Sequence, residues 1–154
     1  MKKPVILVLT AMLMASPAIA QDWGSDYNMG SIGVSGGDAA SGTIVIDCAE
    51  AGNGVVPQGS LSVFVNPAPG AAATAGDFSF HIGGNAITLP FADNGGDGFV
   101  HDKTADSLDQ LSALFDALET GDEVVVRQAD SEIADIGLAG AGAALDGVEA
   151  CLVP

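Results

Sequence analysis

The chain has 154 residues, and 20 acidic side chains outnumber four lysines and arginines to give a formal net charge of −16. Nucleic acid and anionic membrane surfaces are excluded as expected partners, because either would require a basic patch on the protein. The charge allows a basic protein or a cation as the partner, and the favoured alternative interpretation is that an acidic surface only keeps the protein soluble.

The first 20 residues match the pattern of a secretory signal peptide. Lys2 and Lys3 precede an apolar run over residues 5–14, and residues 16–20 supply the small side chains that a signal peptidase reads. The run is too short to anchor the chain in a bilayer, so we expect no membrane insertion once the signal is removed. Cleavage after Ala20 would leave 134 of the 154 residues and two basic against 20 acidic side chains, a charge of −18. We therefore expect a periplasmic or secreted protein.

The exported part divides by composition into an arm and one domain. Residues 21–41 are rich in Gly, Ser and Asp, which indicates a flexible N-terminal arm with at most a short strand over residues 29–34. Residues 42–154 carry the regular apolar patterns and are predicted to form a single domain.

Within that domain, apolar alternation and β-branched runs predict a series of short strands. They cover residues 43–48, 61–65, 78–82, 87–91, 124–126 and 133–138. Gly83 and Gly84 predict a hairpin between the third and fourth of these strands. The segments 66–77 and 92–103 are expected to be loops, and the first, rich in Pro, Ala and Gly, is expected to be the most flexible.

One amphipathic helix is predicted after residue 107, because five apolar residues recur at spacings of three and four. They are Leu108, Leu111, Leu114, Phe115 and Leu118. Asp106 or Ser107 can cap its first turn, and Gly121 is expected to end it in a left-handed conformation. A short helix is expected within residues 139–151. Helices and strands do not alternate regularly, so the expected class is α+β with a largely antiparallel sheet, and a β-sandwich with peripheral helices is the alternative.

Cys48 and Cys151 are the two cysteines of the chain. In an oxidising compartment an isolated pair is expected to form a disulfide, here between the strand predicted over residues 43–48 and the C-terminal segment. Neither cysteine has a second Cys or a His at ligand spacing, so a catalytic or metal-binding thiol is the minor alternative.

Asp93, Asp97 and Asp102 belong to the densest group of oxygen ligands in the sequence. Hard cations such as calcium take about six to eight oxygens, and glycine-rich turns let carboxylates converge. Asp93, Asp97 and Gly98 match positions 1, 5 and 6 of an EF-hand loop, but Thr104 stands where that loop has its bidentate glutamate. A solvated loop is the favoured interpretation and calcium binding is the alternative; no other cofactor is expected.

Two further patterns bear on catalysis. Residues 33–37 match the G-x-S-x-G elbow around Ser35, although no strong strand precedes them and no helix follows. His81 is expected to face outward from its strand, and His101 is expected to lie in the acidic loop. No candidate nucleophile or base has an orienting partner at a defined spacing, so we expect no enzymatic activity. A hydrolase that uses Ser35 or His101 is the alternative.

The C-terminal third carries a resemblance to a known group. A strand, Leu138-Ala139-Gly140, Ala143-Ala144-Leu145 and the terminal Cys151 follow the main helix and the valine-rich strand. In this order the segment resembles the endings of small periplasmic proteins of the invasion-associated locus B type and related secreted proteins of unknown function. The two-cysteine pattern and the acidic charge depart from that group. The resemblance implies a non-catalytic envelope protein, with no catalytic residues to carry over.

Together these patterns predict a non-enzymatic binding or interaction protein. Because the regular elements are needed for the core, the loops 66–77 and 92–103 are expected to form its working surface. Two alternatives are a calcium-binding secreted protein that uses the acidic loop 93–106, and an inhibitor of a basic secreted hydrolase whose acidic loops steer association.

Overall fold

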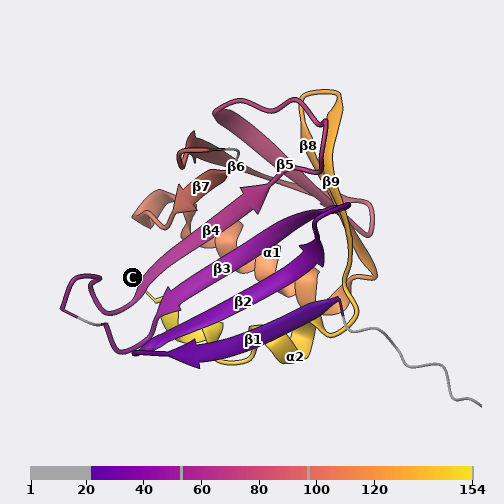
Figure 1. Ribbon diagram of the computed structural model, residues 1–154. Coiled ribbons are helices and arrows are strands. Elements are labelled where there is room, and N and C mark those ends of the chain that lie inside the picture. The colour runs from indigo at the N-terminus through magenta and orange to yellow at the C-terminus, as the bar shows by residue number, and fades with distance from the viewer. Residues whose placement is uncertain (1–21, 53, 97, 154) are drawn as a thin grey trace, which may run out of the picture.

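The computed structural model describes residues 22–52, 54–96 and 98–153, which form a curled β-sheet with helices packed against it (Figure 1). The predicted signal peptide, residues 1–20, lies outside the described residues. The strands are β1 (Trp23–Asn28), β2 (Ser31–Asp38), β3 (Gly42–Ala49), β4 (Ser60–Asn66), β5 (Gly76–Ile82), β6 (Asn85–Asp93), β7 (Phe99–Asp102), β8 (Glu123–Gln128) and β9 (Ser131–Gly137). The helical segments are η1 (Ala105–Ser107), α1 (Leu108–Thr120), α2 (Ala141–Leu145) and η2 (Val148–Cys151). Within the described ranges, no helix has the length and apolarity needed to cross a membrane.

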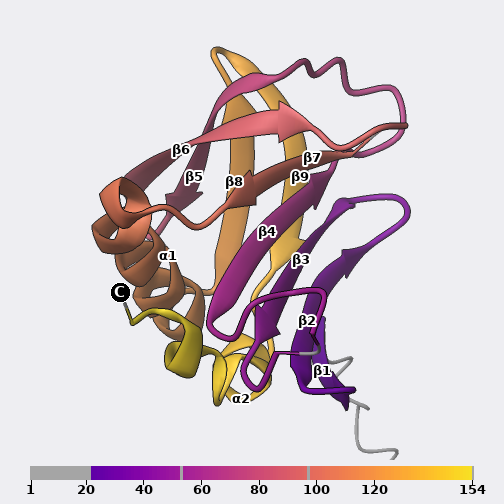
Figure 2. The same cartoon turned by 90° about the vertical axis from the view of Figure 1, so that its left-hand side faces the viewer.

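Neighbouring strands of the described sheet pair antiparallel, in the order β1-β2-β3-β4-β7-β6-β5-β8-β9. Figures 1 and 2 show how the sheet curls, with α1 against its concave side. Its far ends meet, because the Trp23 amide donates to the Ala139 carbonyl at 3.3 Å and the Asp135 amide donates to the Ser41 carbonyl at 3.0 Å. The predicted class is confirmed: an α+β fold with an antiparallel sheet, one main helix and a short C-terminal helix.

The period-two alternation of the strands builds the interior of the curl. The register places Val34, Ile46, Val63 and His101 in one row across β2, β3, β4 and β7, and all four side chains are buried. Helix α1 covers the same interior with one apolar face, made of Leu111, Leu114, Phe115 and Leu118. The sheet thus encloses a single core that the helix closes.

The segment predicted as an acidic connection over residues 92–103 contains a strand. Strand β7 pairs with β4 on one side and with β6 on the other, so it joins the two halves of the sheet. Phe99 and His101 point inward along it, whereas Asp102 is exposed. The prediction of a loop was wrong here because four residues give too short a pattern to distinguish from their glycine-rich surroundings.

The expected flexible arm over residues 21–41 is corrected by the structure. From residue 22 onward it forms β1 and β2, which pair with each other and with β3. Trp23 explains the order of this segment: its side chain is 2% exposed, and its indole N–H donates to the Gly137 carbonyl at 2.8 Å. Gly36 lies opposite Trp23 in the register, and a Cβ there would clash with the indole ring. Gly36, one of the glycines that predicted a flexible arm, is therefore needed to accommodate the buried Trp23 ring.

Helix α1 ends differently from the prediction. Gly121 has φ −83° and ψ 172°, so its backbone is extended and the expected left-handed conformation was wrong. A Cβ at this position would clash with the Ile82 side chain, which makes close packing the reason for the glycine. At the other end Ser107 is the N-cap of α1, but its side chain makes no capping hydrogen bond to the helix. Its hydroxyl instead accepts a hydrogen bond at 3.0 Å from the amide of Thr104, which precedes the helix.

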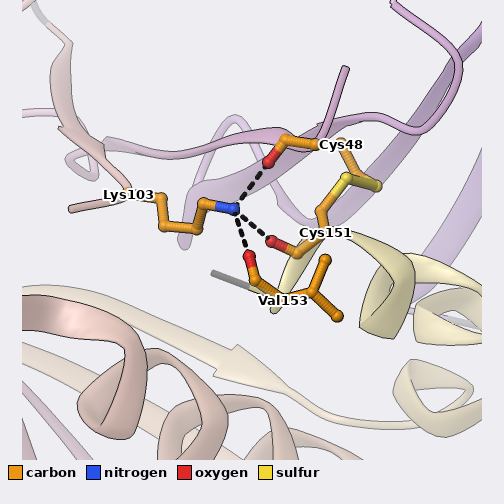
Figure 3. Close-up of a disulfide and its surroundings, with 5 residues drawn as sticks. Cys48, Lys103, Cys151 and Val153 are labelled. Atoms are coloured by element: carbon orange, nitrogen blue, oxygen red, sulfur yellow. Dashed lines mark hydrogen bonds between the residues drawn. A yellow bond between two sulfur atoms is a disulfide. The ribbon is translucent and has the colours of Figure 1, made fainter. Parts of the chain in front are cut away.

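The predicted disulfide between Cys48 and Cys151 is confirmed, with a Cα–Cα distance of 5.8 Å (Figure 3). It joins β3 to η2, and both cysteines are fully buried. Lys103 lies beside the bridge and donates hydrogen bonds from its ammonium group to three carbonyl oxygens, those of Gly59 and Cys151 at 2.7 Å and that of Val153 at 2.9 Å. Covalent and hydrogen bonds therefore hold the C-terminal segment at the same place.

Candidate functional site

The structure separates the described carboxylates of the acidic stretch. Asp93 pairs with Phe99 at the start of β7, and Asp102 ends the same strand, which puts them roughly 10 Å apart along the chain direction. Each already has a local role: Asp93 accepts a hydrogen bond from the Gly95 amide at 2.7 Å, and Asp102 accepts one from the Ser62 hydroxyl at 2.6 Å. Asp97, the third predicted ligand, lies outside the described residues. Within the described ranges, no three His, Cys, Asp or Glu side chains gather as a metal site would require.

Ser35 and His101 lie on opposite faces of the sheet. Ser35 is exposed on β2, whereas His101 is 5% exposed and faces the core from β7. His81 is exposed on β5, as predicted. The prediction that His101 lies in a loop was wrong, because it belongs to a strand. The nucleophile and base that a hydrolase would need are therefore not brought together by these residues.

Two of the predicted loops do meet, at a groove of about 440 Å³. One wall is the segment that follows β4, and the other is the turn between β6 and β7, which Figure 2 shows close together at one end of the molecule. The lining residues are Pro67, Ala68, Pro69, Gly70, Ala71, Ala73, Thr74, Ala75, Asp93, Gly96 and Phe99. Most lining residues are thus small, Asp93 contributes a carboxylate, and polar atoms make up more of the exposed lining than apolar atoms do.

The segment over residues 67–75 is held at both ends, contrary to the expectation that it is the most flexible loop. The Ala68 amide donates to the Ile133 carbonyl at 2.8 Å. Near its other end, the Gln128 side chain accepts from the Thr74 amide at 3.0 Å and donates to the Thr74 carbonyl at 2.6 Å. The Gln128 amide thus bonds both the N–H and the C=O of Thr74, as a residue of a paired strand would. This wall of the groove is therefore held in a fixed position.

A second, smaller pocket of about 250 Å³ lies where β6, β7 and the start of α1 meet. It is lined by Thr88, Leu89, Pro90, His101, Asp102, Thr104, Asp106, Ser107 and Gln110. A row of ring contacts connects its histidine to the core: the His101 and Phe91 centroids are 5.9 Å apart, and Phe91 stacks on Phe78 at 4.8 Å. Phe78 in turn meets Phe99 of the groove edge to edge at 5.1 Å. The two hollows thus lie at opposite ends of one aromatic row.

Comparison with known proteins adds a family to this geometry. The model of the family described as YfjT matches residues 21–145, which is most of the chain. The chain belongs to the YfjT family. No curated protein and no solved structure gives a significant match. The match to the YfjT model says nothing of the resemblance to proteins of the invasion-associated locus B type, which stays a prediction.

Two features of the candidate sites in this YfjT-family chain were not predicted from the sequence. The inward position of His101 could have been predicted, because Phe99 and His101 alternate with Val100 and Asp102 as residues on opposite faces of a strand do. The paired hydrogen bonds between the Gln128 side chain and the Thr74 backbone could not have been predicted, because the two residues are 54 positions apart in the sequence.

Proposed function

We propose that this YfjT-family protein is a non-enzymatic binding protein of the periplasm or the cell exterior, and that the groove between residues 67–75 on one side and Asp93, Gly96 and Phe99 on the other is its binding surface. The observation that carries the proposal is the preformed wall of the groove, which Gln128 and Ile133 hold in place. A fixed loop loses little conformational freedom when a ligand binds, so more of the contact energy appears as affinity.

The chemistry of the groove supports an extended segment of a basic protein as the ligand. Proline and alanine side chains offer apolar contact without deep pockets, and Asp93 offers an acceptor for a lysine or arginine. The excess of acidic residues over the whole chain would attract such a partner from a distance. An inhibitor of a basic secreted hydrolase is the more specific form of this proposal.

Binding can be tested by titrating the mature protein with a lysine-containing peptide rich in alanine and proline, and with the same peptide carrying glutamate in place of lysine. Ala75→Arg should weaken binding of the lysine peptide, because Ala75 lines the groove and is exposed, so the longer cationic side chain enters the groove without disturbing the core. Ala86→Arg is the matched control, since Ala86 is exposed on β6 outside the groove. Equal affinity of the two peptides, or equal effects of the two variants, would refute the proposal.

Two narrower hypotheses have direct tests. Excess protein should slow lysozyme, a basic secreted hydrolase, if the inhibitor hypothesis holds, and unchanged turnover would remove it. Calcium binding by Asp93, Asp97 and Asp102 would raise the melting temperature in proportion to the logarithm of calcium concentration. Calorimetry that detects no heat on calcium addition would remove that alternative.

A further inference from the structure

The described sheet ends in two edge strands, β1 and β9, which differ in what lies along their outer edges. On β9 the Ile133 carbonyl oxygen accepts a hydrogen bond from the Ala68 amide at 2.8 Å. The Asp135 amide of the same strand donates to the Ser41 carbonyl oxygen at 3.0 Å. These contacts occupy backbone groups that would otherwise be open to another strand, so β9 is protected from pairing with a further chain.

β1 has free backbone groups along its outer edge. The turn over residues 29–30 is a two-residue hairpin turn, so the flanking Asn28 and Ser31 form a hydrogen-bonded pair. Such pairs alternate with non-bonded pairs along the two strands, which turns the N–H and C=O groups of Ser25 and Tyr27 away from β2. No other described residue forms a hydrogen bond with these four groups, and both residues are exposed. β1 also contains no proline, lysine or bulge, the usual protections of an edge strand.

A pocket of about 280 Å³ lies beside this free edge, where β1 passes α2 (Figure 1). Its lining consists of Trp23, Gly24, Ser25, Ala143 and Ala144. Side chains directly opposite each other in paired strands lie on the same face, so a side chain opposite Ser25 would lie at this pocket. The small lining residues leave room for a branched apolar side chain such as valine. Tyr27 lies on the same face two residues along the strand and, at 63% exposed, offers a second apolar contact.

The opposite face of β1 is acidic. Asp26 is the one charged residue of the strand, and alternation places it on the face away from Ser25. Its carboxylate lies over Gly33, its partner in the register, where a Cβ would be 2.9 Å from Oδ1. A lysine or arginine opposite Asp26 in an added strand would complement this charge. A second copy would instead bring together two chains that each carry a charge of −16, so charge favours a basic partner.

We propose that β1 accepts an extended segment of a basic partner as an added antiparallel strand. Its apolar side chains would face Tyr27 and the pocket beside β1, and its lysine or arginine side chains would face Asp26. Backbone hydrogen bonds to Ser25 and Tyr27 supply affinity, and the alternation of apolar and basic side chains supplies specificity. This surface is separate from the groove proposed above, because the two share no lining residue.

Hydrogen exchange of single amides, followed by NMR, tests strand addition directly. The probe is the peptide Lys-Val-Lys-Val-Lys-Val, whose valines would lie opposite Ser25 and Tyr27. At a peptide concentration about ten times the dissociation constant, exchange of these two amides should slow about tenfold, because they exchange from the unbound fraction. The same peptide with N-methylated valines keeps its charge but has no N–H to donate to β1, so it should give no protection.

Variants of β1 separate strand pairing from general attraction to an acidic protein. Ser25→Pro removes an outward N–H at an edge, where proline is tolerated, and should abolish protection of the Tyr27 amide. Ser25→Ala keeps the N–H and should bind like the unaltered protein. Asp26→Asn should weaken binding about threefold, as expected for one cross-strand charge pair. Asp116→Asn makes the same change in charge at an exposed position of α1 and should leave the affinity unchanged.

Ala75→Arg, which alters the groove, should leave the protection of Ser25 and Tyr27 unchanged, so the two binding surfaces are tested independently. Three results would overturn strand addition at β1. The first is no protection of these amides at millimolar peptide. The second is equal protection by the N-methylated peptide, which would mean attraction by charge alone. The third is protection that rises with protein concentration when no peptide is present, which would show that a second copy occupies the edge.

Discussion

The Lys103 ammonium group donates a hydrogen bond to the carbonyl oxygen of Cys151 at 2.7 Å, directly beside the disulfide that Cys151 forms with Cys48. Lys103 follows β7, Cys48 lies on β3 and Cys151 ends η2, so three distant parts of the chain meet there. In a chain with four lysines and arginines against 20 acidic residues, the hydrogen bonds of this cation to described residues go to three backbone carbonyl oxygens.

Lys103→Met should therefore destabilise the protein by about 2 kcal/mol, because hydrogen bonds from a charged donor to three carbonyl oxygens are lost. Arg127→Met is the matched control, since it makes the same change in net charge. The exposed Arg127 forms a 3.7 Å ion pair with the exposed Glu132, which predicts a loss below about 0.5 kcal/mol. Urea unfolding measures both values, and equal losses would contradict the structural role of Lys103.

Reduction of the disulfide should lower the free energy of unfolding by about 4 to 5 kcal/mol in the chain-entropy model, because the bridge closes a loop between residues 103 positions apart. Urea midpoints with and without reductant measure the change. A Cys48→Ala/Cys151→Ala variant should unfold at the reduced midpoint whether or not reductant is present. Identical midpoints for the oxidised and reduced protein would show that the bridge contributes nothing.

Gln128→Ala should loosen the wall of the groove with little effect on the rest of the fold. The amide of Thr74 loses its acceptor, so its hydrogen exchange should accelerate towards the rate of an open loop. Affinity for the lysine peptide should fall about tenfold if the fixed wall contributes to binding. Gln110→Ala on α1 leaves the clamp intact and should change neither quantity. Unchanged exchange at Thr74 would show that other contacts hold this loop.

The local elements of this fold could be predicted from the sequence, and its long-range pairings could not. The apolar residues of α1 recur at helical spacing over three turns, which is long enough to predict a helix from the sequence alone. Strand β7 spans four residues, and what fixes it is pairing with β4 and β6 from distant parts of the chain. The same limit applies to the candidate site: composition identified both loops of the groove, but the position of the first one depends on hydrogen bonds to Gln128 and Ile133.

Trp23 should hold the N-terminal segment, which the composition predicted to be flexible, against the rest of the fold. Since it is the one tryptophan of the chain, its fluorescence reports this segment alone, and its emission in the native protein should be blue-shifted and resistant to iodide quenching. Trp23→Ala should cost about 3 to 5 kcal/mol, as expected for a large buried aromatic side chain. Tyr27→Ala is the control on the same strand, because Tyr27 is 63% exposed and should contribute little. If the native protein had the same emission as the unfolded chain, Trp23 would be exposed to solvent and the segment would be a flexible arm.

The raised pKa of Glu119 makes the free energy of unfolding depend on pH. Burial raises the pKa of its carboxyl above the usual 4.5, and repulsion from Glu149, Asp116 and Asp146 raises it further. The folded state therefore binds this proton more tightly than the unfolded state, so the group's contribution to stability is greatest in acid and is lost as the pH rises from 4.5 through the raised pKa.

Replacing that carboxyl tests the sign of the effect. Glu119→Gln should raise the free energy of unfolding at neutral pH by about 0.5 kcal/mol, because the side chain is largely exposed and solvent screens it. The gain should disappear below the usual pKa of 4.5, where both states are protonated, and it should shrink in high salt. Asp109→Asn at the first turn of α1 should have the opposite sign, because the helix dipole favours negative charge there. Urea unfolding at both pH values gives the comparison, and a loss of stability in Glu119→Gln at neutral pH would contradict the repulsion that the structure places around this residue.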